Sequence, residues 1–371
     1  MLKRIMLTTI LFSFSIIVFF ASGYFSPCLL GSYSIYYGPS TSRIYLSCTG
    51  SQESLSLKTI DPVSLNVERE FTMGGLVEKV IPINNGSALL VLLTAVDSDE
   101  NSPDAVLRKI DAQTGQIIDE LFYPNQFAWN MVADCNDEYV FVTLGVDDDT
   151  DEEPPCVKKV DIDNLEIVGT VEFGELSDEI EISDNQNKIF VGSSEAYGGG
   201  YMVLEGGEEI AVPRYWEIGV FNTSDLSECE PIKFNHPYFS IEMGNSNRLF
   251  VSIEAPKTYS SPAFIIVNTI NYEMQQLRFD GNGDIGVLFM SFNPYRNEIY
   301  CTTSICTSNE PEADYCATNR ILKFDLGDYS YEFFQLGFDN LWQTALACTD
   351  NFNRLFCTSE KSNRVHYMDI D

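Results

Sequence analysis

A sequence unit of about 51 residues recurs along almost the whole chain, and this period constrains the fold more than any other feature. One part of the unit is a short apolar–aromatic strand, as in Arg43-Ile44-Tyr45-Leu46-Ser47 and Arg248-Leu249-Phe250-Val251-Ser252. A second part is an alternating strand that ends in Asp or Asn in all seven copies. These seven residues are Asp61, Asp111, Asp161, Asn222, Asn268, Asp325 and Asp369. Units of this length built from strands alone are typical of β-propellers.

The Asp or Asn that ends the second strand has a structural explanation. Its short side-chain oxygen can accept the backbone N–H two residues on, which forms an Asx turn. Turn-forming residues such as Ser64 and Thr114 follow three positions later, and then a further strand. A fourth strand precedes each apolar–aromatic strand. We therefore expect an all-β fold, with residues 24–371 forming one seven-bladed β-propeller of four-stranded antiparallel blades.

The repeat resembles the YVTN-type β-propeller repeats, on the evidence of segments such as Arg248-Leu249-Phe250-Val251-Ser252 followed by Ile266-Val267-Asn268. The resemblance covers nearly all of residues 30–371, although the tetrapeptide Tyr-Val-Thr-Asn itself does not occur. It implies the propeller fold. It implies no single activity, because proteins with such repeats include surface-layer proteins, binding proteins and a few enzymes.

Residues 1–23 have the layout of a secretory signal peptide. Lys3 and Arg4 precede an apolar stretch, and the small residues Ala21-Ser22-Gly23 follow it. We expect cleavage after Gly23 and a secreted, periplasmic or cell-surface location. The alternative is an uncleaved segment that anchors the chain in a membrane, because about 17 apolar residues can just span a bilayer.

Closure of the ring depends on the N-terminal residues. The sequence ends two residues after the seventh Asp/Asn position, so the outermost strand of the last blade is not found there. Counting back from Arg43 by the spacing in the other units places that strand near Tyr24. We expect residues 24–30 to supply this strand, or the last blade to remain three-stranded with an exposed edge.

The chain contains ten cysteines, and an even number in an exported protein favours disulfides. Two candidate pairs bracket loops and a third would close a hairpin: Cys135–Cys156, Cys306–Cys316 and Cys348–Cys357. Buried free thiols are the alternative.

The composition is strongly acidic, with 22 basic and 55 acidic residues and a formal net charge of −33. This charge excludes a nucleic-acid-binding protein that relies on a basic groove, because the acidic surface would repel the phosphates of the nucleic acid. The connections between the second and third strands of the blades, such as residues 144–156 and 302–319, vary most in length. Antiparallel strands place all of them on one face. We expect this acidic face to contact a protein or a glycan.

No cofactor is expected, with Ca²⁺ as the alternative, because two groups of oxygen ligands suit that ion. The first is a dense acidic run, Asp147, Asp148, Asp149 and Asp151. The second, Asp280, Asn282 and Asp284, alternates as at the start of an EF-hand loop, although Ile285 occupies the position of its glycine. The alternatives are a solvated acidic loop and a Gly/Asn turn between blades.

An enzymatic alternative concerns the innermost strands. Propeller lactonases hold a divalent metal in the central tunnel with Glu, Asp and Asn, and similar residues occur here. They are Glu78, Asn130, Glu179, Glu181 and Glu242. A Ser–His–Asp triad is not indicated, because only His236 and His366 could supply the base and no Gly-x-Ser-x-Gly occurs. We therefore expect a non-catalytic exported binding module, with a metal-dependent hydrolase of the lactonase type as the alternative.

Overall fold

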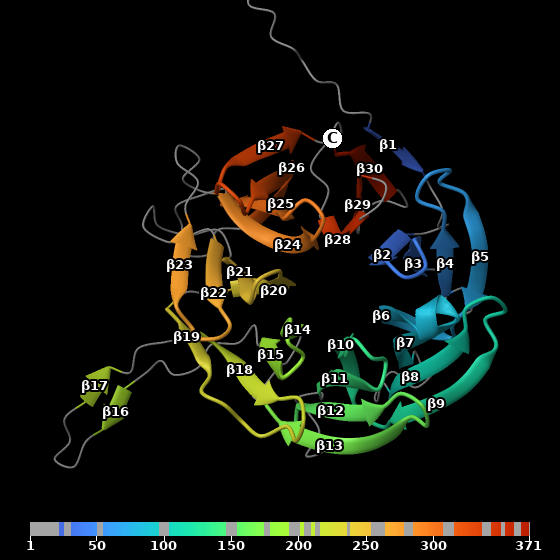
Figure 1. Ribbon diagram of the computed structural model, residues 1–371, viewed down its shortest axis with the longest axis horizontal. Coiled ribbons are helices and arrows are strands. Elements are labelled where there is room, and N and C mark those ends of the chain that lie inside the picture. The colour runs from blue at the N-terminus through green and yellow to red at the C-terminus, as the bar shows by residue number, and fades with distance from the viewer. Residues whose placement is uncertain are drawn as a thin grey trace, which may run out of the picture.

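Seven four-stranded antiparallel sheets surround a central axis in the computed structural model (Figure 1). The structure describes residues 22–25, 31–49, 55–95, 104–145, 154–173, 179–192, 201–203, 209–211, 216–235, 238–253, 264–277, 285–306, 315–335, 343–349, 353–359 and 365–370. The expected seven-bladed propeller is confirmed. Within the described residues, no helix has the length and apolarity needed to cross a membrane.

The first four blades follow the chain, each from its innermost to its outermost strand. Blade 1 is β2 (Gly31–Gly38), β3 (Arg43–Thr49), β4 (Ser56–Ile60) and β5 (Val67–Thr72). Blade 2 is β6 (Gly75–Ile83), β7 (Ala88–Ala95), β8 (Asp104–Asp111) and β9 (Ile117–Tyr123), with the short 3-10 helix η1 (Asn84–Gly86) between β6 and β7. Blade 3 is β10 (Phe127–Ala133), β11 (Tyr139–Gly145), β12 (Cys156–Asp161) and β13 (Glu166–Glu172). Blade 4 is β14 (Glu179–Ile182), β15 (Lys188–Gly192), β18 (Trp216–Asn222) and β19 (Ile232–Phe234).

The other three blades complete the ring. Blade 5 is β20 (Tyr238–Gly244), β21 (Arg248–Ile253), β22 (Phe264–Asn268) and β23 (Met274–Leu277). Blade 6 is β24 (Ile285–Asn293), β25 (Glu298–Cys306), β26 (Tyr315–Asp325) and β27 (Tyr331–Gln335). Blade 7 is β28 (Gln343–Thr349), β29 (Arg354–Ser359), β30 (Val365–Asp369) and β1 (Ser22–Phe25). A separate hairpin, β16 (Tyr201–Val203) with β17 (Glu209–Ala211), is inserted between β15 and β18.

The last blade is therefore closed by the N-terminal end of the chain. β1 runs antiparallel to β30, with Ser22 opposite Met368 and Phe25 opposite Val365. The N-terminal segment supplies the outer strand, as expected, but the strand begins two residues before Tyr24. The predicted signal-peptide boundary after Gly23 lies inside it.

The hydrophobic core is divided among the seven contacts between neighbouring blades. Each of the seven clusters of buried apolar residues draws its members from two adjacent sheets. The cluster between blades 7 and 1, for example, joins Phe356 and Val365 to Ile44 and Ile60. Each sheet thus buries both faces, which explains why the central strands read as continuous apolar runs.

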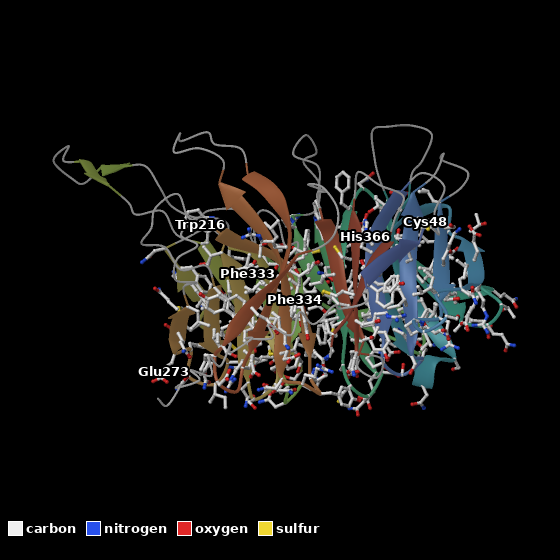
Figure 2. The ribbon with its side chains drawn as sticks, turned by 90° about the horizontal axis from the view of Figure 1, so that it is seen from above. Cys48, Trp216, Glu273, Phe333, Phe334 and His366 are labelled. Atoms are coloured by element: carbon white, nitrogen blue, oxygen red, sulfur yellow. The ribbon has the colours of Figure 1, made fainter. Side chains whose placement is uncertain are left out.

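Two faces of the ring can be distinguished by their connections. The innermost strand turns into the second strand, and the third into the fourth, on what we call the short-turn face. The second strand connects to the third on the opposite face, which we call the loop face. Figure 2 shows Glu273, in a turn of blade 5, on the short-turn face and the β16–β17 hairpin on the opposite side.

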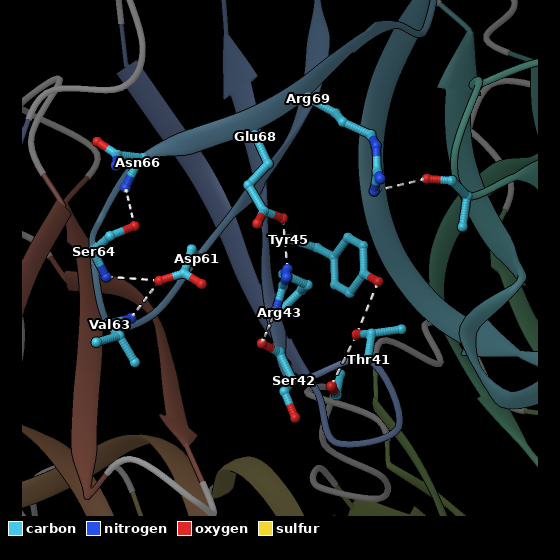
Figure 3. A network of polar contacts seen from close by, with 12 residues as sticks. Thr41, Ser42, Arg43, Tyr45, Asp61, Val63, Ser64, Asn66, Glu68 and Arg69 are labelled. Carbon is cyan, nitrogen blue, oxygen red and sulfur yellow. Dashed lines mark hydrogen bonds and ion pairs between the residues drawn. The ribbon is translucent and has the colours of Figure 1, made fainter.

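The Asx turns lie on the short-turn face. The backbone N–H groups of Val63 and Ser64 donate to Asp61 Oδ1 at 3.0 and 2.6 Å (Figure 3), and the Ser64 bond is the main cause of a lowered Asp61 pKa. Equivalent bonds occur at Asp111, Asp161, Asn268 and Asp325. Asn222 instead donates to Ser227, and Asp369 accepts from Arg354.

A basic residue crosses each of the seven seams between blades at the short-turn face. Arg354 of blade 7 donates to the Pro62 carbonyl of blade 1 at 2.7 Å, and Lys159 of blade 3 to the Thr223 carbonyl of blade 4 at 2.8 Å. Arg69, Lys109, Lys188, Arg248 and Arg296 make the corresponding contacts at the other seams. At five of the seven seams the acceptor is the backbone carbonyl of the residue that follows the repeated Asp or Asn. The Asx turn of one blade therefore also binds a basic side chain of the preceding blade.

Two of the three expected disulfides are wrong, because Cys135, Cys156, Cys348 and Cys357 are not disulfide-bonded. Cys135 precedes the start of β11, whereas Cys156 lies opposite Leu144 near the other end of that strand, so most of the strand length, roughly 20 Å, separates them. Cys348 pairs with Leu355 and Cys357 with Leu346. Such a diagonal places the Cα atoms about 7–8 Å apart, too far for a disulfide.

Two further cysteines complete this comparison. Cys306 lies opposite Tyr315 and Cys316 opposite Ile305, so their backbones are offset by one position; this pair stays a prediction. Cys48 is not among the free thiols.

Candidate functional site in the central tunnel

The innermost strands enclose a central cavity of about 1120 Å³. All five predicted tunnel residues line it: Glu78, Asn130, Glu179, Glu181 and Glu242. The topology explains this convergence, since each of these residues lies on the first strand of its blade. The cavity lining also includes Lys79 and the partly exposed Trp129, which the sequence reasoning did not single out.

A β-bulge shapes most of the strands that line the tunnel. The register shifts once in β2, β6, β10, β20, β24 and β28 where each pairs with its second strand. A bulge leaves backbone groups outside the ladder and redirects the adjacent side chains. It therefore determines which residues face the cavity, and it creates N–H groups that need other partners.

Hydroxyl groups on the second strands satisfy several of these bulges. Thr143 Oγ1 accepts from the Asn130 N–H at 3.0 Å, and Thr302 Oγ1 from the Phe289 N–H at 3.1 Å. Ser252 Oγ accepts from the Ser240 N–H at 2.8 Å. Blade 4 has Gly192 at this position, and its innermost strand has no register shift. The apolar–aromatic strand ends in Ser or Thr in five of the seven sequence units, as at Thr143 and Ser252, and the bulge explains this residue.

Two tunnel glutamates connect neighbouring blades. Glu242 of blade 5 accepts the backbone N–H of Phe292 in blade 6 at 3.0 Å. Glu181 of blade 4 accepts the backbone N–H of Met243 in blade 5. Ser291 of blade 6 continues the series by accepting the Cys348 N–H of blade 7 at 3.0 Å. These side chains supply acceptors to strand edges that face the tunnel and have no further strand beside them.

Burial raises the pKa of both connecting glutamates. The pKa of Glu181 rises from 4.5 to about 8, because burial disfavours its charge and Glu242 repels it. The pKa of Glu242 rises to about 7, mainly through burial, although the Phe292 N–H and Lys79 oppose the rise. These two carboxyl groups therefore titrate near neutral pH.

Glu78 is held at the bulge of β6. Its backbone carbonyl accepts a hydrogen bond from the Tyr36 hydroxyl of blade 1, and Lys79 lies 5.2 Å from the centre of the Tyr36 ring. Burial raises the Glu78 pKa to about 7, against a hydrogen bond from Thr94 that lowers it. The Tyr36 hydroxyl thus donates to the bulge carbonyl of blade 2, whereas in blades 3, 5 and 6 a second-strand hydroxyl accepts the bulge N–H.

The remaining two predicted residues contact each other. The Asn130 side-chain amide donates to Glu179 Oε2 at 3.4 Å, which again joins neighbouring blades, 3 and 4. Among the described residues, no group of three or more His, Cys, Asp or Glu side chains has an arrangement that could hold a metal ion. The tunnel carboxyl groups are distributed along blade contacts, so the arrangement gives the lactonase-type alternative no support.

The predicted Ca²⁺ ligands cannot be placed. Asp147, Asp148, Asp149 and Asp151 lie outside the described residues, and so do Asp280, Asn282 and Asp284. Calcium binding at these positions stays a prediction.

Comparison with known proteins agrees with the fold. No family profile and no curated protein matches the sequence. The β-propeller domain of Cps50 (Swd1) from Myceliophteria thermophila is similar, with a TM-score of 0.66 and 10% identity over 95% of this chain and 100% of that chain. Hydrazine synthase from Kuenenia stuttgartiensis has a TM-score of 0.66 and 13% identity over 92% of this chain and 96% of that one. The chain is a seven-bladed β-propeller, and likeness at this level of identity shows the fold alone.

Proposed function

We propose that this protein is an exported, non-catalytic binding module whose loop face contacts a protein or glycan partner. The observation that carries this proposal is the use of the tunnel carboxyl groups as acceptors for neighbouring blades, at Glu181 and Glu242. Polar groups committed to holding the ring together are not free to converge on a substrate. Binding is then best served by the face with variable connections on a rigid scaffold.

The shape of blade 4 supports the choice of the loop face. The β16–β17 hairpin is inserted between the second and third strands of this blade and extends away from the ring (Figures 1 and 2). The other described turns between strands, such as Asp61–Asn66, are short. A projecting hairpin adds contact surface without disturbing the blades.

Charge supports a basic partner or a glycan with basic groups. The seven seam residues commit a third of the 22 Lys and Arg side chains to the short-turn face. The connections between the second and third strands of the blades contain only Arg214, Lys257, Lys361 and Arg364 as basic residues in the sequence, and they include the acidic run 147–153. Complementary charge accelerates association and selects partners. The YVTN-type resemblance is compatible with such a role.

The test is a binding screen with two matched variants. The purified chain would be applied to a glycan array and to a panel of immobilised basic and acidic proteins at low and high salt. One variant replaces residues 193–215 with a short Gly/Ser linker, and the control, Ile270→Ser, alters an exposed turn residue on the short-turn face. We expect salt-sensitive binding that is lost in the linker variant and retained in the control. Binding that survives the linker but is lost in the control would contradict the proposal.

A further inference from the structure

The strand that closes the ring contains the predicted cleavage site. β1 pairs with β30 through four residues, Ser22 to Phe25. Cleavage after Gly23 would remove the partners of Met368 and Tyr367 and leave two residues, Tyr24 and Phe25. The outermost strands of the other blades contain from three to seven residues. A complete closing strand therefore requires Ser22 and Gly23 to be retained, and cleavage after Gly23 is incompatible with it.

The direction of β1 determines where the upstream chain leaves the ring. β30 ends at Asp369, the Asx-turn position of blade 7, which lies on the short-turn face. Ser22 is paired with Met368 beside that end, whereas Phe25 is paired with Val365 toward the loop face. The upstream chain consequently departs from the short-turn face, and only Ala21 separates β1 from the apolar stretch Ile5–Phe20.

The short-turn face also exposes large apolar side chains at its turns. Tyr295 is 71% exposed, Ile270 67% and Val63 60%, and Tyr329 is exposed in the same region of blade 6 as Tyr295. Tyrosine is enriched where membrane proteins meet the interfacial layer of a bilayer. These residues are independent of β1 in sequence, yet they lie on the face from which the apolar stretch departs.

We propose that the apolar segment is retained and inserted in a lipid bilayer, so that β1 tethers the propeller with its short-turn face toward the membrane. The segment from Ile5 to Phe20 has no charged residue, and Lys3 and Arg4 precede it on the side expected to remain untranslocated. The uncharged stretch between Arg4 and β1, Ile5 to Ala21, has 17 residues, which is the lower limit for a span. The tether is short, so the ring stays at the membrane surface, and the loop face points away from the lipid.

The first test is the N-terminus and the membrane association of the full chain. The gene would be expressed with its own N-terminus in a host with an export pathway, and the protein analysed by intact mass and by extraction with alkaline carbonate. We expect a chain that includes residues 2–21, sediments with membranes after carbonate and dissolves in detergent. An N-terminus at Tyr24, or any chain released by carbonate, would overturn the proposal.

The second test is the orientation of the ring. The full chain would be reconstituted in phosphatidylcholine vesicles that contain brominated lipid, which quenches nearby tryptophan. Tyr295→Trp adds a tryptophan on the short-turn face, and the matched control Glu172→Trp adds one at the loop-face end of β13. We expect lipid quenching of the added fluorescence to be at least about twofold greater for Tyr295→Trp. Equal quenching, or greater quenching for Glu172→Trp, would refute the orientation.

Discussion

The pair of tunnel glutamates makes stability depend on pH in a direction opposite to that of most carboxyl groups. The pKa of Glu242 is 4.5 in an ordinary setting and about 7 in the folded ring. Between these values the folded state binds more protons than the unfolded state, so the free energy of unfolding falls as the pH rises. The stabilisation is complete below about pH 4.5 and is lost as the pH passes through 7. Glu181, with a pKa of about 8, acts in the same direction.

The magnitude follows from the size of the pKa change. One pKa unit corresponds to about 1.4 kcal/mol, so the rise at Glu242 amounts to roughly 3 kcal/mol of unfolding free energy lost between pH 5 and pH 8. Glu242→Gln keeps an oxygen for the Phe292 N–H and removes the charge. We expect this variant to be about as stable as the parent at pH 5 and roughly 3 kcal/mol more stable at pH 8.

The assay is equilibrium urea unfolding at half-unit steps from pH 5 to pH 8.5, with refolding curves to establish reversibility. Glu181→Gln should flatten the pH dependence as well. The double variant should gain less than the sum of the single variants, because the Glu242 charge contributes to the raised Glu181 pKa. Glu273→Gln, in an exposed turn, is the control. Parallel curves for parent and Glu242→Gln over the whole range would refute the reasoning.

Three further substitutions test the structural devices of the ring by urea unfolding at constant pH. Lys159→Met removes a buried ammonium that donates to two carbonyl groups of blade 4, and it should cost about 2 kcal/mol, whereas Lys233→Met at an exposed site should cost much less. Thr143→Val leaves the bulge N–H of β10 without its acceptor and should cost about 1–3 kcal/mol, against almost nothing for the exposed Thr170→Val. Ser246→Gly should stabilise by up to about 1 kcal/mol, because the exposed Ser246 has a backbone φ of 63°; a lower urea midpoint would contradict this.

The propeller fold could be predicted from the repeat, because every copy has to meet the same physical requirement. Each blade must reverse direction after its third strand, and an Asp or Asn such as Asp61 or Asn268 does this with its own side chain. The recurring Ser or Thr was visible as well, but its purpose was not. The need for it arises only from the bulge in the facing strand, as at Thr143, and a bulge leaves no direct mark in the sequence.

The tunnel residues were predicted as a set, whereas their roles were not. Innermost strands can be assigned by counting, which brought Glu181 and Glu242 to the correct place. That Glu242 bonds a backbone N–H fifty residues away depends on the offset between neighbouring sheets, which periodicity does not encode. The disulfide errors have a related origin. Cys135 and Cys156 are close in sequence, but a complete strand separates them.

The pairing of β1 with β30 also has a consequence for the order of events during synthesis. Six blades can assemble from contiguous stretches of chain, because the strands of each follow one another in sequence. The seventh blade cannot, because β1 pairs with β30, which lies roughly 340 residues downstream in the sequence. This blade therefore forms only after the rest of the chain is available. Until then both ends of the incomplete ring present open strand edges, which makes this the stage most prone to mispairing with other chains. If the membrane segment holds β1 at the bilayer surface during that interval, the unpaired strand has less access to the strand edges of other chains.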